Sequence, residues 1–154
     1  MSLTARLASL FSEKPIVRER PLDRFRALLS AQETAALHAE RIAPELRSDR
    51  FQRDLTQVAQ GDRDSAAALR ALLARLGVAA PEPVTDAARL DGITFQKLST
   101  LAEAEAELAR EALSLASIEE DEDARTILEA AGDRHRAQST EIALAATLIT
   151  SFVR

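Results

Sequence analysis

Four polar side chains in this sequence have the chemistry and the positions to bind a cation. Each lies in the apolar stripe of a different helical stretch, and they are Gln32, Asp62, Glu105 and Asp133. A buried carboxylate without a partner costs several kcal/mol, so such a group needs a cation, a hydrogen-bond donor or a proton. Oxygen ligands of this kind favour iron, manganese, magnesium or calcium. Asp62, Glu105 and Asp133 are therefore the candidate metal ligands.

Other polar residues are expected to complete an inward cluster around these three acids. They are Gln32, Ser65, Arg134 and Arg136. One interpretation of the cluster is a working carboxylate metal site. The other is a vestigial site, in which an arginine (Arg63, Arg134 or Arg136) and Ser65 replace the metal with salt bridges and hydrogen bonds. In this interpretation Gln32, an amide at the position of an acid, leaves the cluster with one negative charge fewer and so with less repulsion.

The two histidines are expected outside this cluster. His135 lies two residues after Asp133, and residues two apart on a helix diverge by about 200°. His135 should therefore not share a metal with Asp133, unless a bulge shifts the helix. His38 projects away from the apolar stripe of its own helix, so we expect it at the surface.

The elements that must position these residues are four long helices. Apolar residues recur every three or four positions along each one, and proline and glycine mark their ends. The stretch that follows Gly77 contains Pro81, Pro83 and Gly92 without periodicity, which predicts an extended connection. The predicted organisation is an amphipathic N-terminal arm over 1–21 and a bundle over 22–154, with helices over 22–47, 49–76, 95–118 and 121–152 and a crossover over 77–94.

Loop lengths predict how the helices connect. Short turns make the first and second helices antiparallel, and the third and fourth likewise. A fully extended connection of about sixteen residues reaches about 50 Å, so it can pass the whole second helix of roughly 40 Å. We expect an all-α, up-down-down-up four-helix bundle of two pseudo-symmetric hairpins. A repeat supports this expectation, since residues 59–63 and 130–134 lie seventy-one positions apart and share Gly-Asp-Arg.

Composition restricts the class of protein. The chain has 154 residues, 46% of them hydrophobic and 29% charged, as expected of one soluble globular domain. A net charge of -5 and the absence of Trp and Tyr argue against a nucleic-acid partner. The chain has no Cys, which suits a reducing compartment, and no apolar run approaches the roughly 20 residues of a membrane span. We therefore expect a cytoplasmic protein without a membrane span.

From about residue 22 to residue 148, the repeat and the hairpin architecture resemble the ferritin-like superfamily, especially its small rubrerythrin-like bacterial proteins. In that family each hairpin supplies a Glu from its first helix and a Glu-x-x-His from its second helix to a buried di-iron site. The resemblance implies that Asp62 and Ser65 stand at the acid and histidine positions of one hairpin. It places Asp133 and Arg136 at those of the other, so the implied di-iron ligands are degenerate.

Three functions are compatible with these residues. The lost ligands, the arm and the alanine-rich faces favour a non-catalytic bundle without a cofactor, which acts through self-association as a homodimer or through a protein partner. The alternative is a ferritin-like iron or manganese protein with an oxidase or oxidative-stress role. The third is a bundle whose interior holds a small apolar ligand, because many alanines can leave space there.

Overall fold

The computed structural model describes residues 20–151, and every regular element in this range is a helix. Its elements are α2 (Leu22–Ile42), the short 3₁₀ helix η1 (Ala43–Glu45), α3 (Asp49–Arg75), α4 (Thr94–Ile118) and α5 (Glu122–Ser151). No strand occurs among the described residues, so the predicted all-α class is confirmed. The predicted amphipathic arm lies almost wholly outside the described range.

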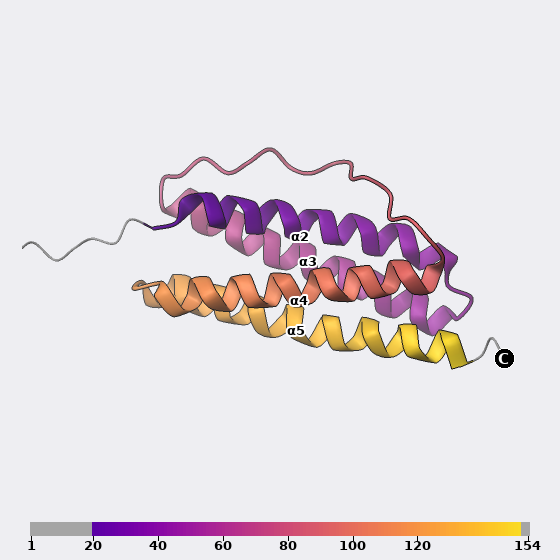
Figure 1. Ribbon diagram of the computed structural model, residues 1–154. Helices are drawn as coiled ribbons and strands as arrows, with labels where there is room; N and C mark the ends of the chain where they lie inside the picture. Colours follow the sequence, from indigo (N-terminus) through magenta and orange to yellow (C-terminus); the bar gives the residue numbers. More distant parts are fainter. Residues whose placement is uncertain (1–19, 152–154) are drawn as a thin grey trace, which may run out of the picture.

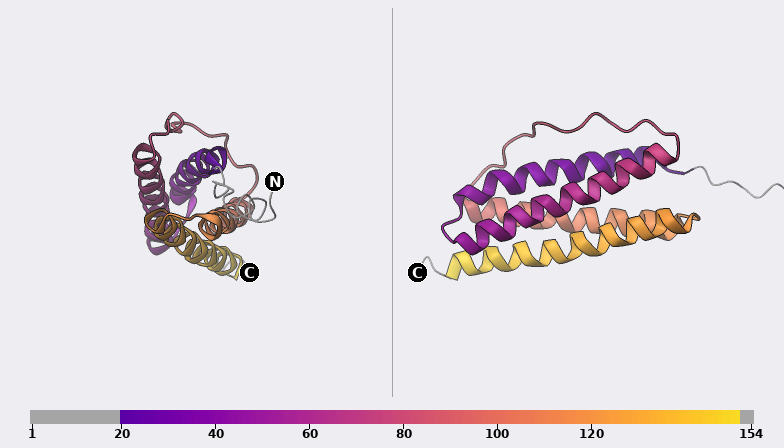
Figure 2. Two further views of the ribbon diagram at one scale, coloured as in Figure 1. Left: turned by 90° about the vertical axis from the view of Figure 1, so that its left-hand side faces the viewer. Right: turned by 180° about the vertical axis from the view of Figure 1, so that it is seen from behind.

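The four long helices lie alongside one another as two antiparallel hairpins (Figure 1). α2 and α3 form the first hairpin, and α4 and α5 form the second. The connection between α3 and α4 runs along the outside of the bundle from one end to the other, so α4 begins at the end where α3 also begins (Figures 1 and 2). No helix of the described residues is long and apolar enough to cross a membrane.

The helix ends follow from local chemistry. Pro44 has no backbone N–H, and the α-helical part of the expected 22–47 segment ends at Ile42, before the 3₁₀ turn of η1. Ser48 caps α3, because its side chain accepts a hydrogen bond from the backbone N–H of Phe51. Gly77 follows α3 with a φ of 70°, the left-handed conformation in which glycine commonly stops a helix.

Side chains of the first hairpin bind the crossover through its backbone carbonyls. Arg70 Nη1 donates to the Pro81 carbonyl at 2.9 Å, and His38 Nε2 lies 2.9 Å from the Ala88 carbonyl. The crossover therefore covers part of α2, and His38 is only partly exposed rather than freely at the surface. Backbone groups that lack a sheet or helix partner are satisfied in this way.

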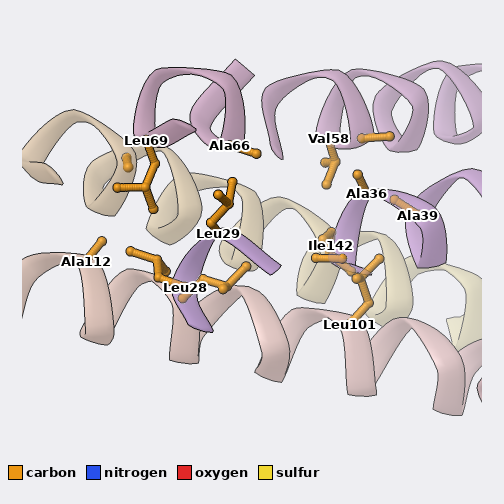
Figure 3. Packing of buried hydrophobic residues seen from close by; sticks show 14 of the residues in the cluster. Leu28, Leu29, Ala36, Ala39, Val58, Ala66, Leu69, Leu101, Ala112 and Ile142 are labelled. Atoms are coloured by element: carbon orange, nitrogen blue, oxygen red, sulfur yellow. The ribbon is translucent and has the colours of Figure 1, made fainter. Parts of the chain in front are cut away.

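Apolar stripes from all four helices fill the centre of the bundle. Figure 3 shows leucines, alanines and an isoleucine from different helices packed against one another. Leu29 on α2, Leu101 on α4 and Ile142 on α5 are almost completely buried. Buried alanines such as Ala36 and Ala112 let neighbouring helices approach closely, because they add little volume to the interface.

The buried positions of the two hairpins correspond at a spacing of 73 residues. On the first helices, Gln32 corresponds to Glu105, and both are completely buried. On the second helices, Asp62 corresponds to His135, and both are again completely buried. Further corresponding buried pairs are Phe25 with Leu98, Leu28 with Leu101, Ala39 with Ala112, Ile42 with Leu115, Leu55 with Leu128, Ser65 with Gln138 and Leu69 with Ile142.

The sequence repeat at a spacing of seventy-one therefore aligns the second helices two residues out of phase. It pairs Asp62 with Asp133, but Asp62 is buried and Asp133 is exposed. A shift of two residues turns a helix by about 200° and so exchanges its buried and exposed faces. Because the buried face decides which side chains meet at the centre, the structural spacing of 73 identifies the partner of Asp62 as His135.

Candidate metal centre

Three ionisable side chains from three helices meet at the middle of the bundle. Asp62 comes from α3, Glu105 from α4 and His135 from α5, and each is completely shielded from solvent. Gln32 of α2, also completely buried, joins them. Each residue lies near the middle of its own helix, which is why four side chains distant in sequence converge at one level of the bundle.

The imidazole of His135 lies at the centre of this cluster. Its Nδ1 atom is 2.8 Å from Glu105 Oε2 and 3.2 Å from Asp62 Oδ1. Its Nε2 atom is 3.0 Å from Gln32 Nε2. Both ring nitrogens are therefore engaged, with the acids on one side of the ring and the amide on the other.

The amide of Gln32 can serve either charge state of the imidazole. As placed, its Nε2 group donates to His135 Nε2, which requires a lone pair on that nitrogen and a proton on Nδ1. Half a turn of the amide would instead present Oε1 to a protonated Nε2. Gln32 Oε1 has no hydrogen-bond partner among the described residues, so this rotation would break no hydrogen bond at that oxygen.

Burial and mutual contact shift the protonation of the cluster. Removal from water, with a smaller contribution from the neighbouring Glu105, raises the pKa of the Asp62 carboxyl to about 8, although contact with His135 opposes the shift. Removal from water lowers the pKa of His135, but contact with Asp62 and Glu105 outweighs this effect and raises it to about 9. At neutral pH the cluster therefore retains protons that the same groups would release in water.

Several oxygens of the cluster lack the partners that buried polar atoms normally have. Both carboxyl oxygens of Asp62 and Glu105 Oε1 are buried without a hydrogen bond to any described residue. Buried polar atoms are nearly always satisfied, so each such exception calls for an explanation. A proton can satisfy one oxygen of Asp62, and a cation can satisfy oxygens of both acids together.

The positions of the ligand atoms fit one metal ion. Asp62, Glu105 and His135 each offer an atom, and these three atoms lie within 4.8 Å of one another. Two ligands at about 2.1 Å from the same ion are at most about 4.2 Å apart, so binding requires movements of only some tenths of an ångström. This buried Asp/Glu/His group could therefore hold a metal.

The remaining predicted site residues divide into two groups. Gln32 and Ser65 are buried as expected, although Ser65 accepts a hydrogen bond from Arg134 Nη1 at 3.1 Å. The prediction that Asp133, Arg134 and Arg136 project inward is wrong, because all three are exposed. Around the axis of α5, Asp133 lies about 200° away from the buried His135, and the two arginines lie about 100° away on either side.

No arginine takes the place of a metal in the described part of the chain. Arg63 forms its ion pair with Glu40, with Nη2 2.6 Å from Oε1. Arg134 donates to the Gly61 carbonyl and to Ser65, and neither oxygen of Asp62 receives a hydrogen bond. The cationic group beside the two acids is His135, which the sequence analysis placed outside the cluster.

A signal for His135 is present in the sequence. Leu128, His135 and Ile142 are seven residues apart in turn, which keeps them on one face of a helix. Ala130, Ala137 and Leu144 have the same spacing, and they lie on the exposed face instead. Gln138, one turn after His135, is a second buried polar residue that the sequence analysis missed.

Comparison of the chain with models of known protein families, with curated proteins and with solved structures finds no match. The chemistry of the buried cluster and the arrangement of the helices therefore carry the functional inference.

Proposed function

We propose that this protein is a ferritin-like, up-down-down-up four-helix bundle whose centre binds one divalent cation. The ligands are a carboxylate oxygen of Asp62, a carboxylate oxygen of Glu105 and Nδ1 of His135. The observation that carries the proposal is the meeting of these three fully buried groups within 4.8 Å. The unpartnered oxygens of Asp62 and Glu105 support it, because a cation would satisfy them.

The pattern of buried polar residues supports the ferritin-like part of this proposal. Six of these residues follow the same pattern in both hairpins. Each hairpin has one buried polar residue on its first helix and two, three positions apart, on its second helix, which is the spacing of the ligands in ferritin-like bundles. The six residues are Gln32, Asp62 and Ser65 in the first hairpin, and Glu105, His135 and Gln138 in the second. Glu119, near the turn between α4 and α5, is the one other buried polar side chain among the described residues.

Charge balance favours one cation over two. Ionised Asp62 and Glu105 together carry the charge that neutralises a single dication, while His135 binds as a neutral ligand. Gln32, Ser65 and Gln138 add no further negative charge. A second dication would leave excess positive charge in a site shielded from solvent, which is strongly unfavourable.

Gln32 acts in this proposal as the residue that orients His135. A metal-bound histidine nearly always donates its other ring N–H to an oxygen, which fixes the ring and its tautomer. With Nδ1 on the cation, Nε2–H of His135 points at the amide of Gln32, 3.0 Å away, and Oε1 is the acceptor there.

The mixed oxygen and nitrogen ligands favour a first-row metal over calcium or magnesium, since imidazole suits transition metals. We propose iron or manganese. Such an ion would supply Lewis acidity and, if it changes oxidation state, one-electron chemistry.

The test is metal binding by the whole chain, measured by elemental analysis and by calorimetric titration with Fe²⁺ under anaerobic conditions, with Mn²⁺ and with Zn²⁺. We expect about one equivalent per chain for the wild type, and loss of binding in Asp62→Ala and in His135→Ala. Asp133→Ala is the matched control, because it removes an exposed acid from the same bundle. Equal binding by Asp62→Ala and the wild type would refute the site.

A second candidate function is the non-catalytic bundle that associates with itself or with a protein partner. The observation that favours it is the exposure of large apolar side chains, with Ile93 68% and Leu144 59% exposed. In this case the Asp/Glu/His cluster is a structural hydrogen-bonded group. A protein that binds no metal but sediments as a dimer, and that becomes monomeric with Leu144→Glu, would favour this function over the first.

A further inference from the structure

A large hollow lies at one end of the bundle, away from the Asp/Glu/His cluster at its middle. It occupies the end where η1 leads into α3, where α4 starts and where α5 finishes, on the right in Figure 1. Its volume is about 820 Å³, within the range of sites that bind small molecules. We call it the end groove.

The wall of the end groove is largely apolar. Leu46 and Phe51 line it from the start of the α3 region, and Leu148 and Ile149 line it from α5. The α5 contribution comes from a stretch without any charged residue, since residues 142–151 contain no Asp, Glu, Lys or Arg. An alkyl chain could therefore pack there without burying a charge.

The rim of the groove carries unpaired positive charge. Arg47 and Arg50 line it, both are exposed, and neither has an ion pair or hydrogen bond within residues 20–151. Glu45 also lines the groove, but Lys97 Nζ lies 2.6 Å from its Oε1 atom and neutralises it. The charge that remains available to a ligand is positive.

We propose that the end groove binds an anionic amphiphile with a single alkyl chain and a carboxylate head. The chain would lie along Leu46, Phe51 and Leu148, and the head would pair with Arg47 and Arg50. An uncharged ligand would leave the two guanidinium groups unused, and a small anion would leave the apolar wall in contact with water. Only a molecule with both parts matches the wall and the rim together.

This site is independent of the proposed metal centre. Phe51 and Asp62 both belong to α3 and are eleven residues apart, which corresponds to about 16 Å along the helix. Failure of either proposal therefore leaves the other untouched, and the two can be measured on the same protein preparation.

The experiment is calorimetric titration of the full chain with dodecanoate below its micelle concentration. Acetate tests the head group alone, and dodecyltrimethylammonium tests the same chain with the opposite charge. We expect one dodecanoate per chain, no binding of acetate and much weaker binding of the cation.

Variants identify the residues responsible. We expect the double variant Arg47→Ala/Arg50→Ala to bind dodecanoate about tenfold more weakly or worse, because the carboxylate head loses both of its cationic partners. Leu148→Asn should also weaken binding, because it removes apolar wall. Arg53→Ala is the matched control, because Arg53 is an exposed arginine of α3 outside the groove, and it should bind as the wild type does.

Three results would overturn the proposal. The first is no binding of dodecanoate, including the case in which sedimentation shows that a second copy closes the groove. The second is equal affinity for dodecanoate and dodecyltrimethylammonium. The third is an affinity for dodecanoate that the double variant leaves unchanged.

Discussion

The protonation of the buried cluster predicts that the metal-free protein loses stability as the pH rises, and that Asp62→Asn reduces this loss. The pKa of Asp62 is about 8 in the folded chain, against about 3.9 in an unfolded one. Between these values the folded state holds a proton that the unfolded state has released, so raising the pH favours unfolding. The pKa of His135, raised to about 9, acts in the same direction above about pH 6.5.

The size of the effect follows from the number of protons held. One retained proton changes the free energy of unfolding by about 1.4 kcal/mol per pH unit. Between pH 6 and pH 8, Asp62 alone should therefore reduce stability by about 2 kcal/mol, because its folded-state carboxyl is already half ionised at pH 8. Asparagine resembles a protonated aspartate in shape and cannot ionise. Asp62→Asn thus removes this contribution, and it also removes one of the two acids that raise the pKa of His135.

The assay is urea unfolding in the presence of a chelator at pH 6, 7 and 8. Far-ultraviolet circular dichroism is the suitable signal, because the chain is helical and has neither Trp nor Tyr for fluorescence. The matched control is Asp133→Asn, which removes the same charge from an exposed position of α5. The control should lose stability with pH as steeply as the wild type.

Two results would refute this reasoning. One is a metal-free wild type whose stability stays constant or rises between pH 6 and 8. The other is Asp62→Asn following the same pH dependence as the wild type.

Saturating Mn²⁺ should reverse the sign of the pH dependence of stability in the wild type, because protons compete with the metal for Asp62 and His135. The thermal midpoint of the metal-bound wild type should then rise with pH.

The remaining predictions concern Gln32, which contacts His135, and the hydrophobic core. Gln32→Leu should lower the affinity for metal about 10-fold to 100-fold, because His135 loses the partner of its Nε2 atom. Gln32→Glu keeps an acceptor there and should bind metal at least as tightly as the wild type, and calorimetric titration distinguishes the two. Leu101→Ala should destabilise the fold by about 2 to 5 kcal/mol in urea unfolding, because Leu101 is completely buried and its truncation leaves a cavity. A loss below about 1 kcal/mol would mean that the core is loosely packed at that level.

The helices and all of the central cluster except His135 could be predicted, because leucine marks burial clearly. On α3, Leu55 and Leu69 flank Asp62 at seven residues on either side. On α4, Leu98 lies seven residues before Glu105. Large apolar residues at that spacing define one face of a helix. Projection onto that face found Asp62 and Glu105, and both are buried.

The interpretation of α5 was wrong because alanine does not distinguish the two faces. Alanine is common in cores and is also tolerated at helix surfaces. Ala130 and Ala137 are exposed, whereas Ala131 is buried although it directly follows Ala130. With alanines on both sides, the Gly-Asp-Arg repeat decided the alignment, and this repeat is two residues out of register with the core. Only the packing of α5 against its neighbours resolves the choice.

The correspondence of Asp62 with His135 makes the two hairpins chemically unlike at their centre. Two copies of the first hairpin would bring together two aspartates and two glutamines, with no base among them. Two copies of the second would bring together two glutamates and two histidines. The natural chain instead joins a half that contributes an acid and an amide to a half that contributes an acid and a base. Neither half can stand in for the other, so the symmetry of the scaffold is not shared by the chemistry that it encloses.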